Sequence, residues 1–128
     1  MVTMKILDEK NCPVRITMDI IGGKWKPIIL YYVNSLGVCR FGELKRYIPH
    51  ITKKMLTQQL RELERDGIIR RKVFAQVPPR VDYSLTKDGK TLEPILNSMA
   101  NWGAKHRAGQ VNVPRVHRTR IQETSRKG

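Results

Sequence analysis

This chain of 128 residues has little cysteine and no long apolar run. Cys12 and Cys39 lie far apart and, with three scattered histidines, match no zinc-ligand spacing, so we expect free thiols, no metal and no cofactor. No apolar run approaches the roughly 18–20 residues of a membrane span. Residues 1–13 lack the apolar segment of a secretory signal. We therefore expect a cytoplasmic protein with no membrane partner.

Acidic residues are also scarce, and the motifs of an enzyme are missing. The chain has 11 Asp and Glu against 25 Lys and Arg, a net charge of +14. That excess indicates a partner that is a polyanion, most often nucleic acid, although a ribosomal-type protein or a membrane-surface binder would share it. There is no Ser/His/Asp order and no glycine-rich phosphate loop, so we expect no catalytic residue and no enzyme.

One stretch, residues 51–67, predicts a helix with two distinct faces. Thr52 can cap its start, and Gly67 can close its end. The apolar stripe consists of Leu56, Leu60 and Leu63. The opposite stripe consists of Lys54, Gln58, Arg61 and Arg65. Cationic and amide side chains of this kind bind phosphates and base edges.

The segments on either side of this helix predict an α+β fold, a winged helix-turn-helix. Residues 41–47 predict a short helix that Pro49 ends, and helix, tight turn, helix is the helix-turn-helix unit. Residues 68–77 and 81–85 predict the two strands of a hairpin around Pro78-Pro79-Arg80. A basic hairpin after a helix-turn-helix is a wing.

This fold predicts double-stranded DNA as the partner and two groups of residues that contact it. Side chains near the N-terminus of the second helix reach base edges in the major groove. The predicted base readers are Lys53, Lys54, Thr57, Gln58 and Arg61. The predicted phosphate and wing contacts are Lys24, Lys26, Lys45, Arg46, Arg70, Arg71, Lys72 and Arg80, the last at the wing tip. The alternatives are a solvated helix with ion pairs and an ordinary charged hairpin.

The ends of the chain predict extra N- and C-terminal helices. Helices are expected from Pro13 and over residues 87–106, where Pro94 should produce a kink or mark the true start. The helix over residues 87–106 follows an already complete winged core. Its apolar stripe therefore needs a surface to cover it, which predicts a homodimer. The stripe consists of Leu92, Ile95, Leu96, Met99 and Trp102. The domain, residues 12–106, would lie between an N-terminal arm, 1–11, and a basic C-terminal tail, 107–128.

Cys12 is the candidate redox sensor. A helix N-terminus and Arg15 one turn on would both stabilise its thiolate, the form that reacts with oxidants and electrophiles. The alternative is a small buried hydrophobe at the start of a helix. Cys39, in an apolar strand, is expected to be structural.

Taken in order, the motifs resemble those of the HxlR-type winged helix-turn-helix transcriptional regulators, which are related to the MarR family. The motifs are Cys12-Pro13-Val14, Ile21-Gly22-Gly23-Lys24-Trp25, Arg40-Phe41-Gly42-Glu43-Leu44, residues 51–63, residues 66–71, Tyr83-Ser84-Leu85-Thr86 with Gly89, and Trp102-Gly103. The resemblance implies a homodimer joined through its N- and C-terminal helices on an inverted-repeat operator. Several members of the family sense electrophiles, aldehydes or oxidants through a cysteine in a Cys-Pro context, which Cys12 matches.

The sequence thus predicts a sequence-specific DNA-binding regulator, a repressor or a stress-responsive switch, with an oxidant or small electrophile acting at Cys12. One alternative is a regulator driven by a small ligand, with Cys12 structural. Another is a non-specific architectural nucleic-acid-binding protein. An RNA-binding protein is disfavoured because no sheet with exposed aromatics is expected.

Overall fold

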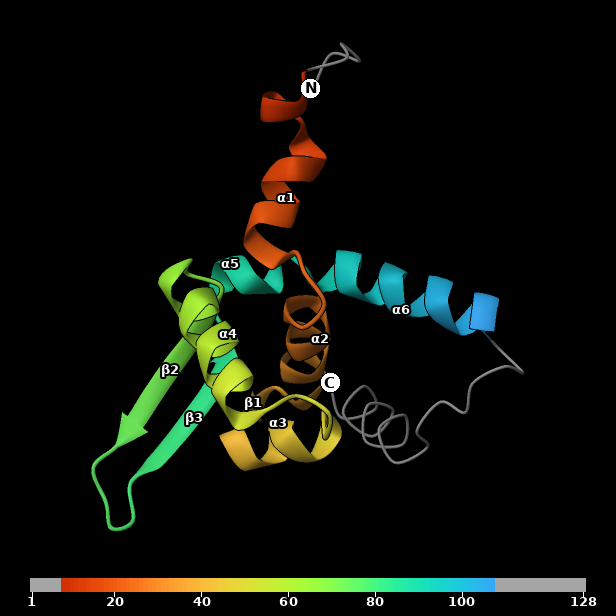
Figure 1. The fold of residues 1–128 in the computed structure, drawn as a ribbon. Helices are drawn as coiled ribbons and strands as arrows, with labels where there is room; N and C mark the ends of the chain where they lie inside the picture. Colours follow the sequence, from red (N-terminus) through yellow and green to blue (C-terminus); the bar gives the residue numbers. More distant parts are fainter. Residues whose placement is uncertain (1–7, 108–128) are drawn as a thin grey trace.

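In the computed structural model, which describes residues 8–107, the chain forms helices packed against one small sheet (Figure 1). The helices are the 3-10 turn η1 (Glu9–Asn11), α1 (Pro13–Ile21), α2 (Lys26–Leu36), α3 (Phe41–Tyr47), α4 (Lys53–Arg65), α5 (Lys87–Lys90) and α6 (Glu93–Arg107). The strands are β1 (Val38–Cys39), β2 (Ile69–Phe74) and β3 (Arg80–Leu85). Part of the predicted arm is therefore the turn η1. The predicted tail beyond residue 107 lies outside the described residues.

Helix α4 has the start, the stop and the faces that its sequence predicts. The hydroxyl oxygen of Thr52 accepts a hydrogen bond from the backbone N–H of Met55 at 3.0 Å. Gly67 has a φ of 76°, in the left-handed region that favours glycine, and the N–H of Ile68 closes the last turn on the carbonyl of Leu63 at 2.9 Å. The predicted apolar stripe is buried: Leu56, Leu60 and Leu63 are at most 2% exposed.

The core lies where α2, α3, α4 and the sheet meet. Pro49 follows the end of α3, as predicted, and Ile51 in the turn points inward, being only 1% exposed. The large side chains that are almost completely buried are Ile29, Leu30, Leu44, Ile51, Leu56, Leu60, Leu63 and Ile69. Helix α3, the turn and α4 therefore form one packed unit on α2.

The wing is a hairpin whose first strand is shorter than predicted and whose second strand begins one residue earlier. Strand β2 ends at Phe74, which pairs with Arg80, so residues 75–79 form the loop. Arg80 is thus the first residue of β3, and its predicted place at the tip is wrong. The sheet has the order β1-β3-β2, because Val38 and Cys39 pair with Ser84 and Tyr83. Val38–Cys39, the strand that contains Cys39, is therefore the third strand of this sheet.

The predicted helix over residues 87–106 is divided in two. Thr86 caps α5 by accepting a hydrogen bond from the N–H of Gly89 at 2.9 Å. Helix α6 starts at Glu93, so Pro94 lies in its first turn, where a missing N–H costs little. Pro94 therefore marks the true start of the helix, one of its two predicted roles.

Only part of the predicted dimer stripe is open to a partner. Helix α6 packs on α2 and buries Leu96, which is 2% exposed, while Leu92 is partly buried against the core. The stripe is therefore corrected to three exposed residues, Ile95, Met99 and Trp102.

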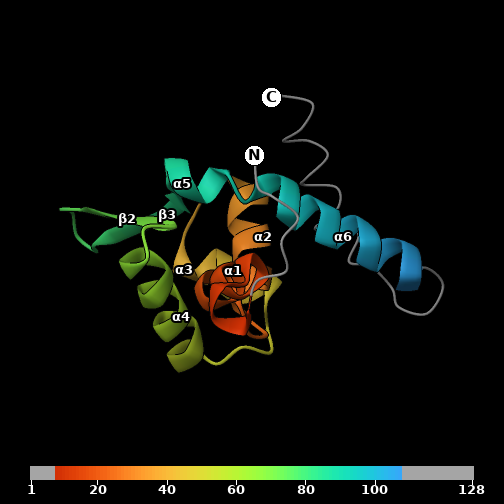
Figure 2. The same cartoon turned by 90° about the horizontal axis from the view of Figure 1, so that it is seen from above.

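Helices α1 and α6 project from this body in different directions (Figures 1 and 2). Helix α1 also exposes apolar side chains: Val14, Ile16 and Met18 are each more than half exposed. None of the helices in the described part of the chain is both long and apolar enough to span a membrane. The large exposed apolar side chains on these two helices thus lie on elements that extend away from the core.

Gly89 provides a test of how α5 packs on the backbone of Ile68, the residue just before β2. A Cβ added there would lie 2.2 Å from the backbone oxygen of Ile68, so α5 would have to move. We expect Gly89→Ala to lower the Tm in thermal unfolding followed by circular dichroism. Gly103→Ala on α6, where a Cβ meets nothing within 4 Å, is the matched control. It should leave the Tm unchanged or raise it, since alanine is favoured over glycine in helices by about 1 kcal/mol. Equal losses in both variants would contradict the packing.

Candidate nucleic-acid interface

The outer face of α4 brings the predicted base readers together. Lys53, Lys54, Gln58 and Arg61 are exposed and Thr57 is half-buried. They line one shallow hollow together with Glu62 and Arg65. The hydroxyl of Thr57 donates to the backbone oxygen of Lys53 at 2.8 Å, which leaves Thr57 as an acceptor toward a ligand. Burial of the leucine stripe on the other side of the helix places this cationic face outward.

The pair formed by Lys26 and Glu62 was not expected from the sequence. Nζ of Lys26 donates to Oε1 of Glu62 at 2.6 Å, and Nε2 of Gln58 donates to Oε2 of the same carboxylate at 3.2 Å. These two hydrogen bonds lower the pKa of Glu62, and the one from Lys26 has the larger effect. Lys26 is only 8% exposed. A buried, paired ammonium does not fit the predicted phosphate contact, so Lys26 is removed from that group.

Several other predicted phosphate contacts do lie on the surface. Arg46 on α3 is exposed, as are Arg70, Arg71 and Lys72 on β2. Nζ of Lys45 donates to the backbone oxygen of Pro49 at 2.9 Å, and Nζ of Lys24 lies 4.7 Å from the centre of the Trp25 ring. A second hollow, between α4 and the sheet, is lined by Thr57, Leu60, Arg61, Glu64, Arg71 and Tyr83. Arg71 is thus a cationic wing residue that shares a concave surface with the base readers Thr57 and Arg61.

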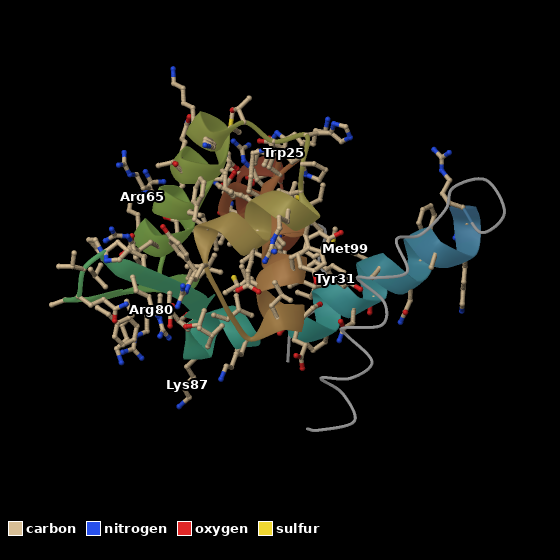
Figure 3. The ribbon with its side chains drawn as sticks, turned by 90° about the horizontal axis from the view of Figure 1, so that it is seen from below. Trp25, Tyr31, Arg65, Arg80, Lys87 and Met99 are labelled. Atoms are coloured by element: carbon tan, nitrogen blue, oxygen red, sulfur yellow. The ribbon has the colours of Figure 1, made fainter. Side chains whose placement is uncertain are left out.

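Arg80 is held by the wing itself rather than presented at its tip. Its guanidinium donates two hydrogen bonds to the carboxylate of Asp82, at 3.1 and 3.0 Å, and stacks over the Phe74 ring at 4.7 Å. Nε of Arg40 lies 3.9 Å from the same carboxylate. The hydrogen bonds from Arg80 lower the pKa of Asp82 against the opposing effect of burial. Figure 3 shows Arg80 on the wing and Arg65 on α4 on one side of the molecule, away from the far end of α6.

The two cysteines have different surroundings, as predicted. Cys12 is half-buried at the N-cap of α1, and its thiol makes no capping hydrogen bond. Arg15, expected to support its thiolate, forms an ion pair with Glu9. Cys39 is 1% exposed in β1 and belongs to the core. Among residues 8–107, no group of three or more His, Cys, Asp or Glu side chains could hold a metal ion.

A helix-turn-helix with a cationic second helix and a basic hairpin defines a winged helix-turn-helix protein of the DNA-binding class. Within this class, the family described as HxlR-like helix-turn-helix matches residues 20–110, and the chain belongs to that family. The family resemblance and the α+β winged helix-turn-helix fold predicted from the sequence are thereby confirmed.

Relatives and solved structures agree with this assignment. The chain is similar to the HTH-type transcriptional regulator YdeP of Bacillus subtilis, described as uncharacterized, with 56% identity over 100 residues, 78% of this chain and 77% of that protein. It is also similar to the redox regulator HypR. The oxidized form has a TM-score of 0.71 at 53% identity and covers 80% of this chain and 100% of that one. The reduced form has a TM-score of 0.72 at 55% identity, and the match covers 76% of this chain and 95% of that one. The family consists of transcriptional regulators rather than enzymes.

The carboxylate of Asp82 gives the wing a dependence on pH. Because its pKa lies below the ordinary 3.8, its stabilising contribution is complete above that value and is lost as the pH falls through the lowered pKa. We expect Asp82→Asn to lower the Tm by a few degrees at pH 7, and the difference from the parent to shrink below pH 3.8. Thermal unfolding over a pH series measures this. Asp19→Asn, the same charge change on exposed α1, is the control. A difference that did not vary with pH would contradict the assignment.

Proposed function

We propose that this regulator binds a duplex operator with the N-terminal half of α4 in the major groove. The observation that carries the proposal is the exposed row of Lys53, Lys54, Gln58 and Arg61 on a helix whose other face is buried. Lysine and arginine can pair with guanine, and glutamine with adenine. Arg71, which lines a hollow beside α4, and the exposed Arg46 on α3 would bind DNA phosphates.

The operator would be read by two copies of the chain. The exposed apolar residues of α1 and of the outer part of α6 require cover, and a second copy supplies a matching surface. Twofold symmetry would then place two α4 helices on half-sites about one DNA turn apart or a multiple of it, which suits an inverted repeat.

Two substitutions separate base reading from phosphate binding. Gln58→Ala should reduce the preference for operator over scrambled DNA, because a base contact is lost. Arg46→Ala should weaken binding to both DNAs equally and make log K less steeply dependent on log salt, by about one unit of slope. Fluorescence anisotropy titrations at several salt concentrations measure both quantities. Equal affinity of the parent for operator and random DNA would favour the architectural alternative.

We further propose that an oxidant or electrophile regulates this protein by reacting with the thiol of Cys12. The thiol lies at the start of α1, the helix with the exposed apolar face, so its modification would change how two copies meet. The similarity to a protein described as a redox regulator supports this assignment. The second candidate, a small ligand held between two copies, is favoured by the same apolar surface.

Diamide, a thiol-specific oxidant, distinguishes these possibilities. Treatment should abolish operator binding by the parent and leave Cys12→Ser unaffected, because Cys39 is buried. Cys39→Ala, which keeps Cys12 as the sole thiol of each copy, should respond like the parent in the same mobility-shift assay, because diamide joins the Cys12 thiols of two copies as a disulfide and is itself reduced to the hydrazine. Loss of binding by treated Cys12→Ser would contradict the sensor role. Thermal stabilisation by a candidate metabolite, equal in reduced and oxidised protein, would favour the small-ligand alternative.

A further inference from the structure

We propose that Lys26 and Glu62 are positioning residues that determine base preference by fixing the orientation of the Gln58 amide. This inference rests on the proposed function, in which Gln58 reads a base. It assigns a role in recognition to two residues that do not themselves belong to the base-reading group.

The three side chains form a chain of hydrogen bonds from α2 to the exposed face of α4. Nζ of Lys26 lies 2.6 Å from Oε1 of Glu62, and Nε2 of Gln58 lies 3.2 Å from Oε2. The Lys26 side chain is 10% exposed and that of Glu62 is 25% exposed, whereas Gln58 is exposed. The series therefore runs from the interior to the position at which DNA would be met.

The chemistry of the carboxylate determines which way the amide faces. A carboxylate can only accept hydrogen bonds, so the NH₂ group of Gln58 must face Glu62 and its oxygen must face away. The second N–H of Nε2 remains available beside that oxygen. A donor and an acceptor side by side are what a bidentate contact with adenine requires. An amide free to turn over would present the pair in either order and distinguish bases less well.

Lys26 has a separate effect on Glu62. An unpaired carboxylate at this position would repel DNA phosphates, and it could accept a hydrogen bond from cytosine, which is a base contact of a different specificity. The ammonium of Lys26 neutralises the carboxylate and holds it through Oε1. Glu62 is thereby directed toward Gln58 rather than toward the DNA.

The experiment compares affinities for the four base pairs at the operator position where Gln58→Ala has its largest effect. A bidentate contact gives a preference of roughly five- to 150-fold. We expect Glu62→Gln, whose amide can accept or donate, to reduce that preference to within about threefold. Lys26→Met should reduce it as well, whereas Lys26→Arg, which retains the ion pair, should keep it. Glu93→Gln, the same charge change at the exposed start of α6, outside the proposed interface, is the matched control and should also keep it.

A double-mutant cycle separates positioning from a merely structural role. If Glu62 acts through Gln58, Glu62→Gln should have no further effect on base preference in the Gln58→Ala protein. A parental preference in Glu62→Gln, or the same loss in both backgrounds, would overturn the proposal and leave Gln58 as a reader. If Gln58→Ala alone changed no base preference at any operator position, the reader assignment would fail, and the positioning role with it. Circular dichroism of every variant identifies any that fails to fold, and Lys26→Arg and Glu62→Gln are the most conservative of the set.

Discussion

Burial of a single leucine stripe determines the rotation of α4, and the candidate interface depends on that rotation. Leu56, Leu60 and Leu63 are buried in one core cluster with residues of α2, α3 and the sheet. Since a helix repeats every 3.6 residues, covering one stripe leaves the opposite one in solvent. The cationic and amide side chains of α4 are therefore held at a fixed angle to the basic wing.

The few acidic residues of the chain reduce the charge that faces a ligand. Glu62 and Asp82 pair with Lys26 and Arg80, so two of the cations counted from the sequence are occupied within the protein. Each pair lies near the proposed DNA-binding surface, where an unpaired carboxylate would repel phosphates. The net charge of +14 therefore describes attraction to a polyanion at long range, while contact depends on the cations that are not paired in this way.

The proposed sensing and reading parts lie at different sides of the molecule, and α2 connects them. Figure 1 shows α1, which Cys12 precedes, extending from the top of the body, and the wing extending from it at the lower left. Helix α1 ends at Ile21, and α2 begins at Lys26, the residue that contacts Glu62 on α4. A change in how α1 meets a second copy would reach the reading helix through packed elements rather than through a long loop. This arrangement is consistent with the proposal that Cys12 influences DNA binding.

The sequence by itself determined the features that depend on neighbouring residues: the Thr52 cap, the stop at Gly67 and the two faces of α4. These are local because caps, prolines and helical periodicity act within a few residues. Only the tertiary structure decided that β1 joins the sheet, that Leu96 is covered by its own chain, and that Lys26 and Arg80 are paired. Lys26 and Glu62 are 36 residues apart, and no local pattern signals their meeting. Periodicity shows which face is apolar or charged, but the partner that covers or pairs with it depends on how the elements pack.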